Sequence, residues 1–190
     1  MSAVLAGLAA GAVHVVSGPD HLAALGPDVS RAPSRALALG ALWGLGHGAG
    51  VLLAAGFGRW LGAVIALERA SAWAELSVGF VLVALGVRAL TRRPASTPPR
   101  GHGAFGVGLL HGAAGAHHLV MALPALLLDE TGAALYLAAY LVAAVLAMTG
   151  LGGAVAWGLR ERGERARRLT HSVAGFAAVG VGLFWVAASL

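Results

Sequence analysis

The stretch His14-Val-Val-Ser-Gly18-Pro19-Asp20-His21-Leu22 places metal-capable side chains and a helix-breaking pair inside an otherwise apolar segment. A second copy, His111-Gly-Ala-Ala-Gly115-Ala-His117-His118-Leu119, lies 97 positions further along the chain. Both copies fit the pattern H-x3-G-x-[D/H]-H-L-x4-P. Ionisable groups in a membrane-like background are costly to keep and are usually functional. The repeated motif therefore indicates a site.

Composition indicates an integral membrane protein. Of the 190 residues 58% are hydrophobic and 11% are charged, and the mean hydropathy is +0.81, whereas a soluble domain has about 25% charged residues. The apolar runs are continuous, which favours membrane helices over the alternating strands of a barrel. The chain has no cysteine, which excludes disulfides and thiolate metal sites. Its basic residues are all arginines, which lie mostly between apolar runs, a pattern typical of topology signals rather than of nucleic-acid binding.

The apolar segments divide the chain into six predicted spans. Each is long enough for a bilayer core about 30 Å thick; they cover residues 3–26, 36–58, 73–91, 104–128, 133–157 and 170–189. Breaks are predicted between them, notably at 59–72, 92–103 and 160–168. We predict an all-α integral membrane protein with a single transmembrane domain over residues 1–190. Repeat 1 covers about 1–91, a linker covers 92–103, and repeat 2 covers about 104–190.

The two halves are predicted to be inverted repeats. Glu75-Leu-Ser-Val-Gly79-Phe80 resembles His171-Ser-Val-Ala-Gly175-Phe176, so the third and sixth spans correspond as the motif-bearing spans do. Three spans per half make the second half enter the membrane from the opposite side, an architecture common among transporters. Most arginines lie on the face that joins spans 1–2, 3–4 and 5–6. The positive-inside rule then predicts a multi-pass protein of the cell (inner) membrane with both termini outside.

The Gly18-Pro19 pair predicts a broken first helix. Proline removes a backbone donor and disfavours a helical conformation at the residue before it. A break here would free carbonyl groups near Val15 and would start a new helical segment that carries Asp20 and His21 in its first turn. Freed carbonyls, a carboxylate and imidazoles together favour a cation site.

The candidate metal ligands are the polar residues at predicted membrane depth. Imidazole suits nickel, cobalt, zinc and copper, and carboxylates neutralise charge. The predicted ligands are His14, Asp20, His21, His47, His111, His117 and His118, and the predicted pathway or supporting residues are Ser17, Gly18, Glu75 and His171. If one copy of the motif forms the primary site, we expect the trio His14, Asp20 and His21, because the first copy has the carboxylate and the stronger break. His102 is expected in a solvated loop, and the tryptophans near span ends are expected to be interfacial-belt or packing residues.

These motifs resemble those of a known family. HVVSGPDHLAAL at 14–25, Leu45-Gly-His47-Gly48 and His111-Gly-x-x-Gly115-x-x-His118 resemble the nickel/cobalt transporter (NiCoT/NicO) superfamily, in particular its small urease-accessory UreH-like permeases. The resemblance covers essentially the whole chain. It implies that His14, Asp20, His21 and His47 bind or conduct the metal, and it implies a link to the maturation of metalloenzymes such as urease or hydrogenase. The chain departs from the larger permeases in having five rather than four residues between His14 and Asp20, and six rather than eight spans.

The predicted function is a permease for divalent transition-metal ions, Ni²⁺ or Co²⁺, that works by alternating access. The metal would be the transported substrate, with no permanent cofactor and no enzymatic activity. Two alternatives stay open: an intramembrane zinc-dependent hydrolase assisted by Ser17, and an exporter of another small solute. The sequence leaves open the direction of transport, the coupling ion and whether the chain forms a homo-oligomer.

Overall fold

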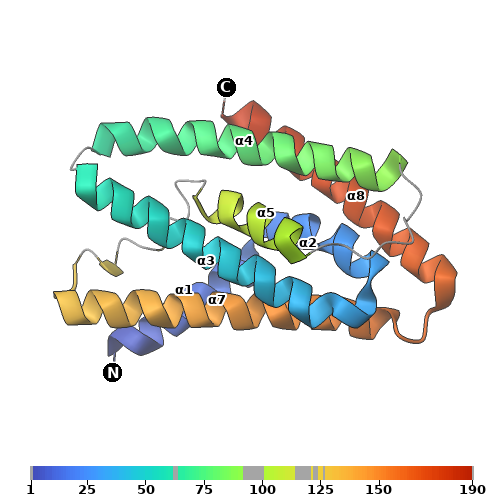
Figure 1. Cartoon of the computed structure of the whole chain (residues 1–190), viewed down its shortest axis with the longest axis horizontal. Coiled ribbons are helices and arrows are strands. Elements are labelled where there is room, and N and C mark those ends of the chain that lie inside the picture. The colour runs from blue at the N-terminus through green and yellow to red at the C-terminus, as the bar shows by residue number, and fades with distance from the viewer. Residues whose placement is uncertain are drawn as a thin grey trace.

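Helices joined by short turns make up the part of the chain that the structure describes, with no strand among these residues. The computed structural model describes residues 2–61, 64–91, 101–113, 121, 124–125 and 127–189, without the side chains of 55–72 and 74. The elements are α1 (Ser2–Ser17), α2 (Pro19–Arg31), η1 (Pro33–Arg35), α3 (Ala36–Leu61), α4 (Val64–Thr91), α5 (Gly101–Ala113), α7 (Glu130–Leu159) and α8 (Gly163–Ala188) (Figure 1). The prediction of an all-α chain is confirmed for these residues.

Several of the helices are suited to a membrane. Pro33–Ala54, Glu130–Leu159 and Gly163–Ala188 are long and apolar enough to cross one, and α1 and α2 pass the same test as a bent pair. The described residues thus contain three candidate spans, or four if the bent pair is one span. Large apolar side chains such as Val16, Trp157 and Phe184 are exposed on the outside of the bundle, as expected for helices in contact with lipid. The chain is therefore an all-helical membrane protein.

The predicted break in the first span is confirmed. α1 ends at Ser17, Gly18 has an extended backbone (φ −87°, ψ 106°), and Pro19 begins α2 at an angle of 67° to α1. Proline at the first helical position loses no hydrogen bond, because its missing donor would have had no intrahelical partner there. α2 then continues through Pro27 to Arg31.

Two of the predicted loops are wrong because the helices extend into them. The loop predicted at 59–72 shrinks, since α3 runs to Leu61 and α4 starts at Val64. The loop predicted at 160–168 is helical from Gly163 onward. Within that turn Glu164 accepts hydrogen bonds from Arg167 (2.6 Å) and Arg168 (3.1 Å). Such pairs three and four residues apart favour the helix.

The predicted span at 104–128 is described only in part. α5 covers Gly101–Ala113 and therefore begins inside the predicted linker, while 114–120, 122–123 and 126 lie outside the described residues. A turn at 127–128 precedes α7. Asp129 caps α7 by accepting a hydrogen bond from the Gly132 amide at 2.8 Å. A carboxylate at this position satisfies a backbone donor that the helix leaves unpaired, which fixes where α7 starts.

Glycines allow the helices to pack closely in pairs. α1 packs on α7 and α5 packs on α3, while α4 packs on α8. Gly11 of α1 faces the Tyr140 carbonyl of α7, and Gly108 of α5 faces the Trp43 carbonyl of α3. Between α4 and α8, Gly79 lies against Gly182 and Gly86 lies against Gly175. Small residues at helix contacts let backbones approach where lipid supplies no hydrophobic drive.

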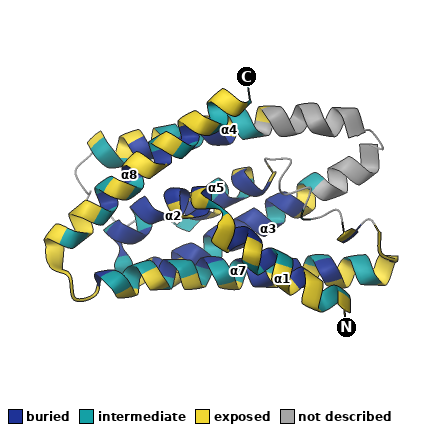
Figure 2. Cartoon of the chain, turned by 180° about the vertical axis from the view of Figure 1, so that it is seen from behind, coloured by how far each residue is buried: buried dark blue, intermediate teal, exposed yellow. Residues whose placement is uncertain are grey.

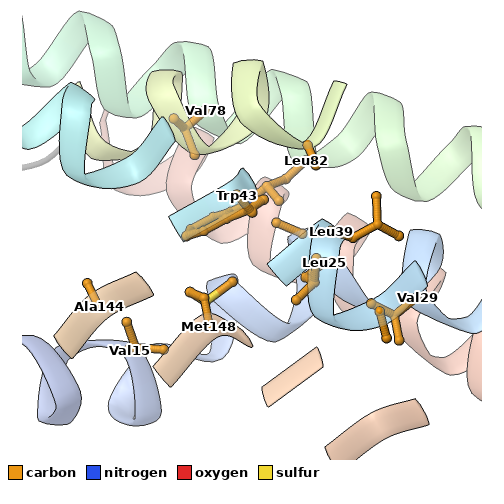
Figure 3. Packing of buried hydrophobic residues seen from close by; sticks show 12 residues of the cluster. Val15, Leu25, Val29, Leu39, Trp43, Val78, Leu82, Ala144 and Met148 are labelled. Carbon is orange, nitrogen blue, oxygen red and sulfur yellow. The ribbon is translucent and has the colours of Figure 1, made fainter. Parts of the chain in front are cut away.

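The short helix α2 is the most enclosed element. The long helices surround it in Figure 1, and nine of its 13 residues are buried, as Figure 2 shows in dark blue. Its Leu25 and Val29 pack with Leu39 and Trp43 of α3 and with Leu82 of α4 (Figure 3). This apolar cluster fixes the position of α2, and therefore of the polar residues in its first turn.

Two glycines on α5 provide a matched test of this packing. A methyl group at Gly108 would collide with the Trp43 backbone, whereas one at Gly106 would meet nothing within 4 Å. We expect Gly108→Ala to destabilise the protein by about 1–3 kcal/mol, the usual cost of overpacking. Gly106→Ala should be neutral or stabilising by up to about 1 kcal/mol, because alanine favours helix. Thermal unfolding in detergent measures both, and equal melting temperatures would contradict the packing.

Candidate metal centre

Five metal-capable side chains from four helices meet in the interior. They come from the end of α1, the start of α2, the middle of α3 and the end of α5, and their residues are only 0–7% exposed. The five are His14, Asp20, His21, His47 and His111. All were predicted as ligands from the sequence, and the structure brings them together.

His21 lies at the centre of the group. Its ring centroid is 4.8 Å from that of His14, 5.4 Å from that of His47 and 5.1 Å from that of His111. The His14 and His47 rings are stacked, with centroids 5.2 Å apart. The His14, His47 and His111 rings therefore all lie close to the central His21 ring.

The helix break orients the His21 ring. Nδ1 lies 3.1 Å from the carbonyl oxygen of Val15, which α1 leaves free because the helix stops at Ser17. When Nδ1 donates to this carbonyl, neutral imidazole keeps its lone pair on Nε2. Nε2 is buried and has no hydrogen-bond partner among the described residues. Carbonyl groups commonly orient metal-binding histidines in this way, so His21 is well suited to bind a metal through Nε2.

Asp20 brings a carboxylate to the same centre. Its Oδ1 accepts a hydrogen bond from the His21 amide at 3.1 Å, in the first turn of α2. Its Oδ2 lies 3.0 Å from Nε2 of His111. The positive end of a helix dipole stabilises an anion at this position, which lowers the cost of keeping Asp20 buried.

The five residues form two overlapping sets of three potential ligands. One set is His14, His21 and His47, and the other is Asp20, His21 and His111. Within each set the ligand atoms lie within 4.8 Å of one another. The structure thus divides the expected trio of His14, Asp20 and His21 between two sets that have His21 in common.

Two aromatic residues of the centre were missed by the sequence analysis. The Trp43 ring stacks on His47 (5.2 Å, 11°) and also contacts His21 and His111, each at 5.3 Å. Tyr140 lies 6.0 Å from His14. Trp43 lies away from the ends of its predicted span and was given no role, but it forms a wall of the centre. Its spacing of four residues from His47, one helical turn, was the available signal.

The structure places the other predicted polar residues away from the group of five ligands or outside the described residues. Ser17 is exposed, and its hydroxyl donates to the His14 carbonyl at 3.4 Å instead of joining the group. Glu75 is half-buried and belongs to neither ligand set. His102 is exposed, as expected, but it lies in α5 rather than in a loop. His117 and His118 lie outside the described residues.

His171 has a role in packing. Its Nδ1 lies 3.0 Å from the Ser30 hydroxyl and 3.2 Å from the Pro27 carbonyl, and its Nε2 lies 3.1 Å from the Ala89 carbonyl. It therefore links α8 to the far end of α2 and to α4. Through these contacts His171 holds α2 in place without belonging to either ligand set.

Comparison with known proteins gives two plant relatives. The chain is 30% identical over 207 aligned positions to the chloroplast protein FOR GROWTH AND FERTILITY 1 of Arabidopsis thaliana, and 31% identical over 203 to FOR GROWTH AND FERTILITY 2 of the same organism. Each alignment covers 93% of this chain but only 56% and 54% of the relatives, so the chain spans about half their length. No family model and no solved structure matches the chain.

Gly18 provides a test of the centre's geometry. Its backbone conformation is open to any residue, but a Cβ atom here would collide with the His21 ring and the Asp20 carboxylate. We expect Gly18→Ala to fold and to lower Ni²⁺ affinity by roughly 10–100-fold, as for other changes that misorient ligands. Ser17→Ala should leave affinity unchanged, because this side chain points away. Calorimetric titration of the purified proteins with Ni²⁺ measures these affinities. A wild-type Ni²⁺ affinity in Gly18→Ala would contradict the close placement of Gly18 against His21 and Asp20.

Proposed function

We propose that this protein is a membrane permease for divalent transition-metal ions, with Ni²⁺ or Co²⁺ as the transported substrate. The observation that carries the proposal is the buried group of four histidines and one aspartate at a helix break. Ionisable groups inside membrane helices mark substrate or ion pathways by default, and imidazole with carboxylate is a donor set that suits these metals.

The donor set also favours a passing ion over a permanently held one. At most one of the five ligands is anionic, so a bound dication keeps about one uncompensated charge. Uncompensated charge is expensive in a low-dielectric interior. The ion would therefore bind, but not as tightly as in a site with several carboxylates or thiolates. Moderate affinity is what a permease needs in order to release its substrate.

The helix packing supports an inverted repeat, which we include in the proposal. α1 packs on α7 as α5 packs on α3, the exchange expected if the first half is related to the second by a two-fold axis. Trp43 lies 97 positions before Tyr140, as His14 does before His111, and the ring contacts Trp43–His111 and Tyr140–His14 are reciprocal. We propose six spans, alternating access by rocking of the two halves, and both termini outside the cell membrane.

Transport rather than hydrolysis is proposed for a geometric reason. An intramembrane zinc hydrolase would use Ser17 next to the metal, but this side chain is exposed and donates to the His14 carbonyl. The residues whose rings contact the ligands, Trp43 and Tyr140, are aromatic. These features favour binding and passage of the ion.

Uptake of radioactive nickel into proteoliposomes tests the proposal. We expect His21→Ala to reduce uptake at least tenfold while the protein still inserts, because it removes the central ligand. His102→Ala is the matched control, since it removes an exposed histidine of α5, and it should transport like wild type. Uptake by His21→Ala at the wild-type rate would exclude this centre as the transport site.

A further inference from the structure

The two overlapping ligand sets differ in charge. The set of His14, His21 and His47 consists of imidazoles alone, which carry no charge when they bind a metal, whereas the set of Asp20, His21 and His111 includes a carboxylate. A dication is better compensated in the second set, because one of its two charges is neutralised in a buried place. The two sets therefore offer the same ion two positions with different binding free energies.

His21 belongs to both sets but can serve only one ion at a time. Its Nδ1 is directed at the Val15 carbonyl, which leaves Nε2 as its metal-binding atom. Two ions cannot share this single lone pair. Occupation of one position therefore excludes occupation of the other.

The remaining ligands come from different helices. His14 and His47 belong to α1 and α3, whereas Asp20 and His111 belong to α2 and α5. His47 and His111 have ring centroids 5.7 Å apart, so a short displacement separates the two positions. An ion held by His21 could exchange the ligands of one set for those of the other without becoming free.

We propose that the ion occupies two alternative positions with His21 as the common ligand, and that it crosses the centre by ligand exchange around this histidine. The Asp20–His21–His111 position is the resting position, and the His14–His21–His47 position is the transit position. This inference rests on the proposed function and specifies how the ion moves through the same centre.

Equilibrium binding of Co²⁺ to the purified protein tests the two positions, because its visible spectrum reports on the ligands. Wild type should bind one Co²⁺. His14→Gln and His47→Gln should leave its spectrum unchanged, since the ion rests in the other position. Asp20→Asn and His111→Gln should both shift the spectrum and weaken binding by tenfold or more, while one Co²⁺ still binds at the transit position. His102→Gln is the control for loss of a histidine elsewhere.

Transport provides the second measurement. His14→Gln and His47→Gln should reduce Co²⁺ uptake at least tenfold although their equilibrium binding is normal, because the transit position is lost. Circular dichroism and gel filtration establish that each variant is folded.

Two results would overturn the inference. The same spectral change in all four variants would show one site that uses all five residues, and two Co²⁺ bound at once would show independent sites. In both cases wild-type uptake would still support the permease. Absence of both Co²⁺ binding and uptake in the wild type would instead contradict the proposed function itself.

Discussion

The contact on which the centre depends is the one between Nδ1 of His21 and the carbonyl oxygen of Val15. It exists because α1 stops at Ser17 and α2 starts at Pro19, so a carbonyl that would accept a helical hydrogen bond is free to accept one from a side chain. The same break directs the first turn of α2 into the bundle. A continuous helix would remove both the free carbonyl and the convergence of His14 with His21.

Glycine makes the convergence of the other helices possible. α5 can bring His111 to the centre because Gly108 and Gly112 lie directly on the backbone of α3 at Trp43 and His47. Side chains at these positions would move α5 outward and separate His111 from Asp20. The polar centre is thus surrounded by close backbone contacts and aromatic rings, and its five residues are buried. In a buried site the electrostatic difference between a neutral and a carboxylate-containing ligand set is larger than in water.

Much of the centre could be predicted from the sequence because its signals are local. The Gly18-Pro19 break depends on proline sterics alone, and the five described ligands are ionisable residues in apolar runs. The role of Trp43 was missed because it depends on contacts with His21 and His111, which lie on two other helices. His171 was predicted as a pathway or supporting residue, and its packing role was missed because its partners on α2 and α4 are distant in sequence. Loop limits were wrong where pairs such as Glu164 with Arg168 extend a helix beyond its apolar core.

The most direct test of the account is the location of a bound ion. A crystal structure of the protein grown with Ni²⁺, with an anomalous difference map recorded at the nickel edge, measures it. The account predicts a peak beside Nε2 of His21, within bonding distance of Asp20 and His111. A structure with nickel bound elsewhere and no peak among the four histidines and Asp20 of the centre would contradict this prediction.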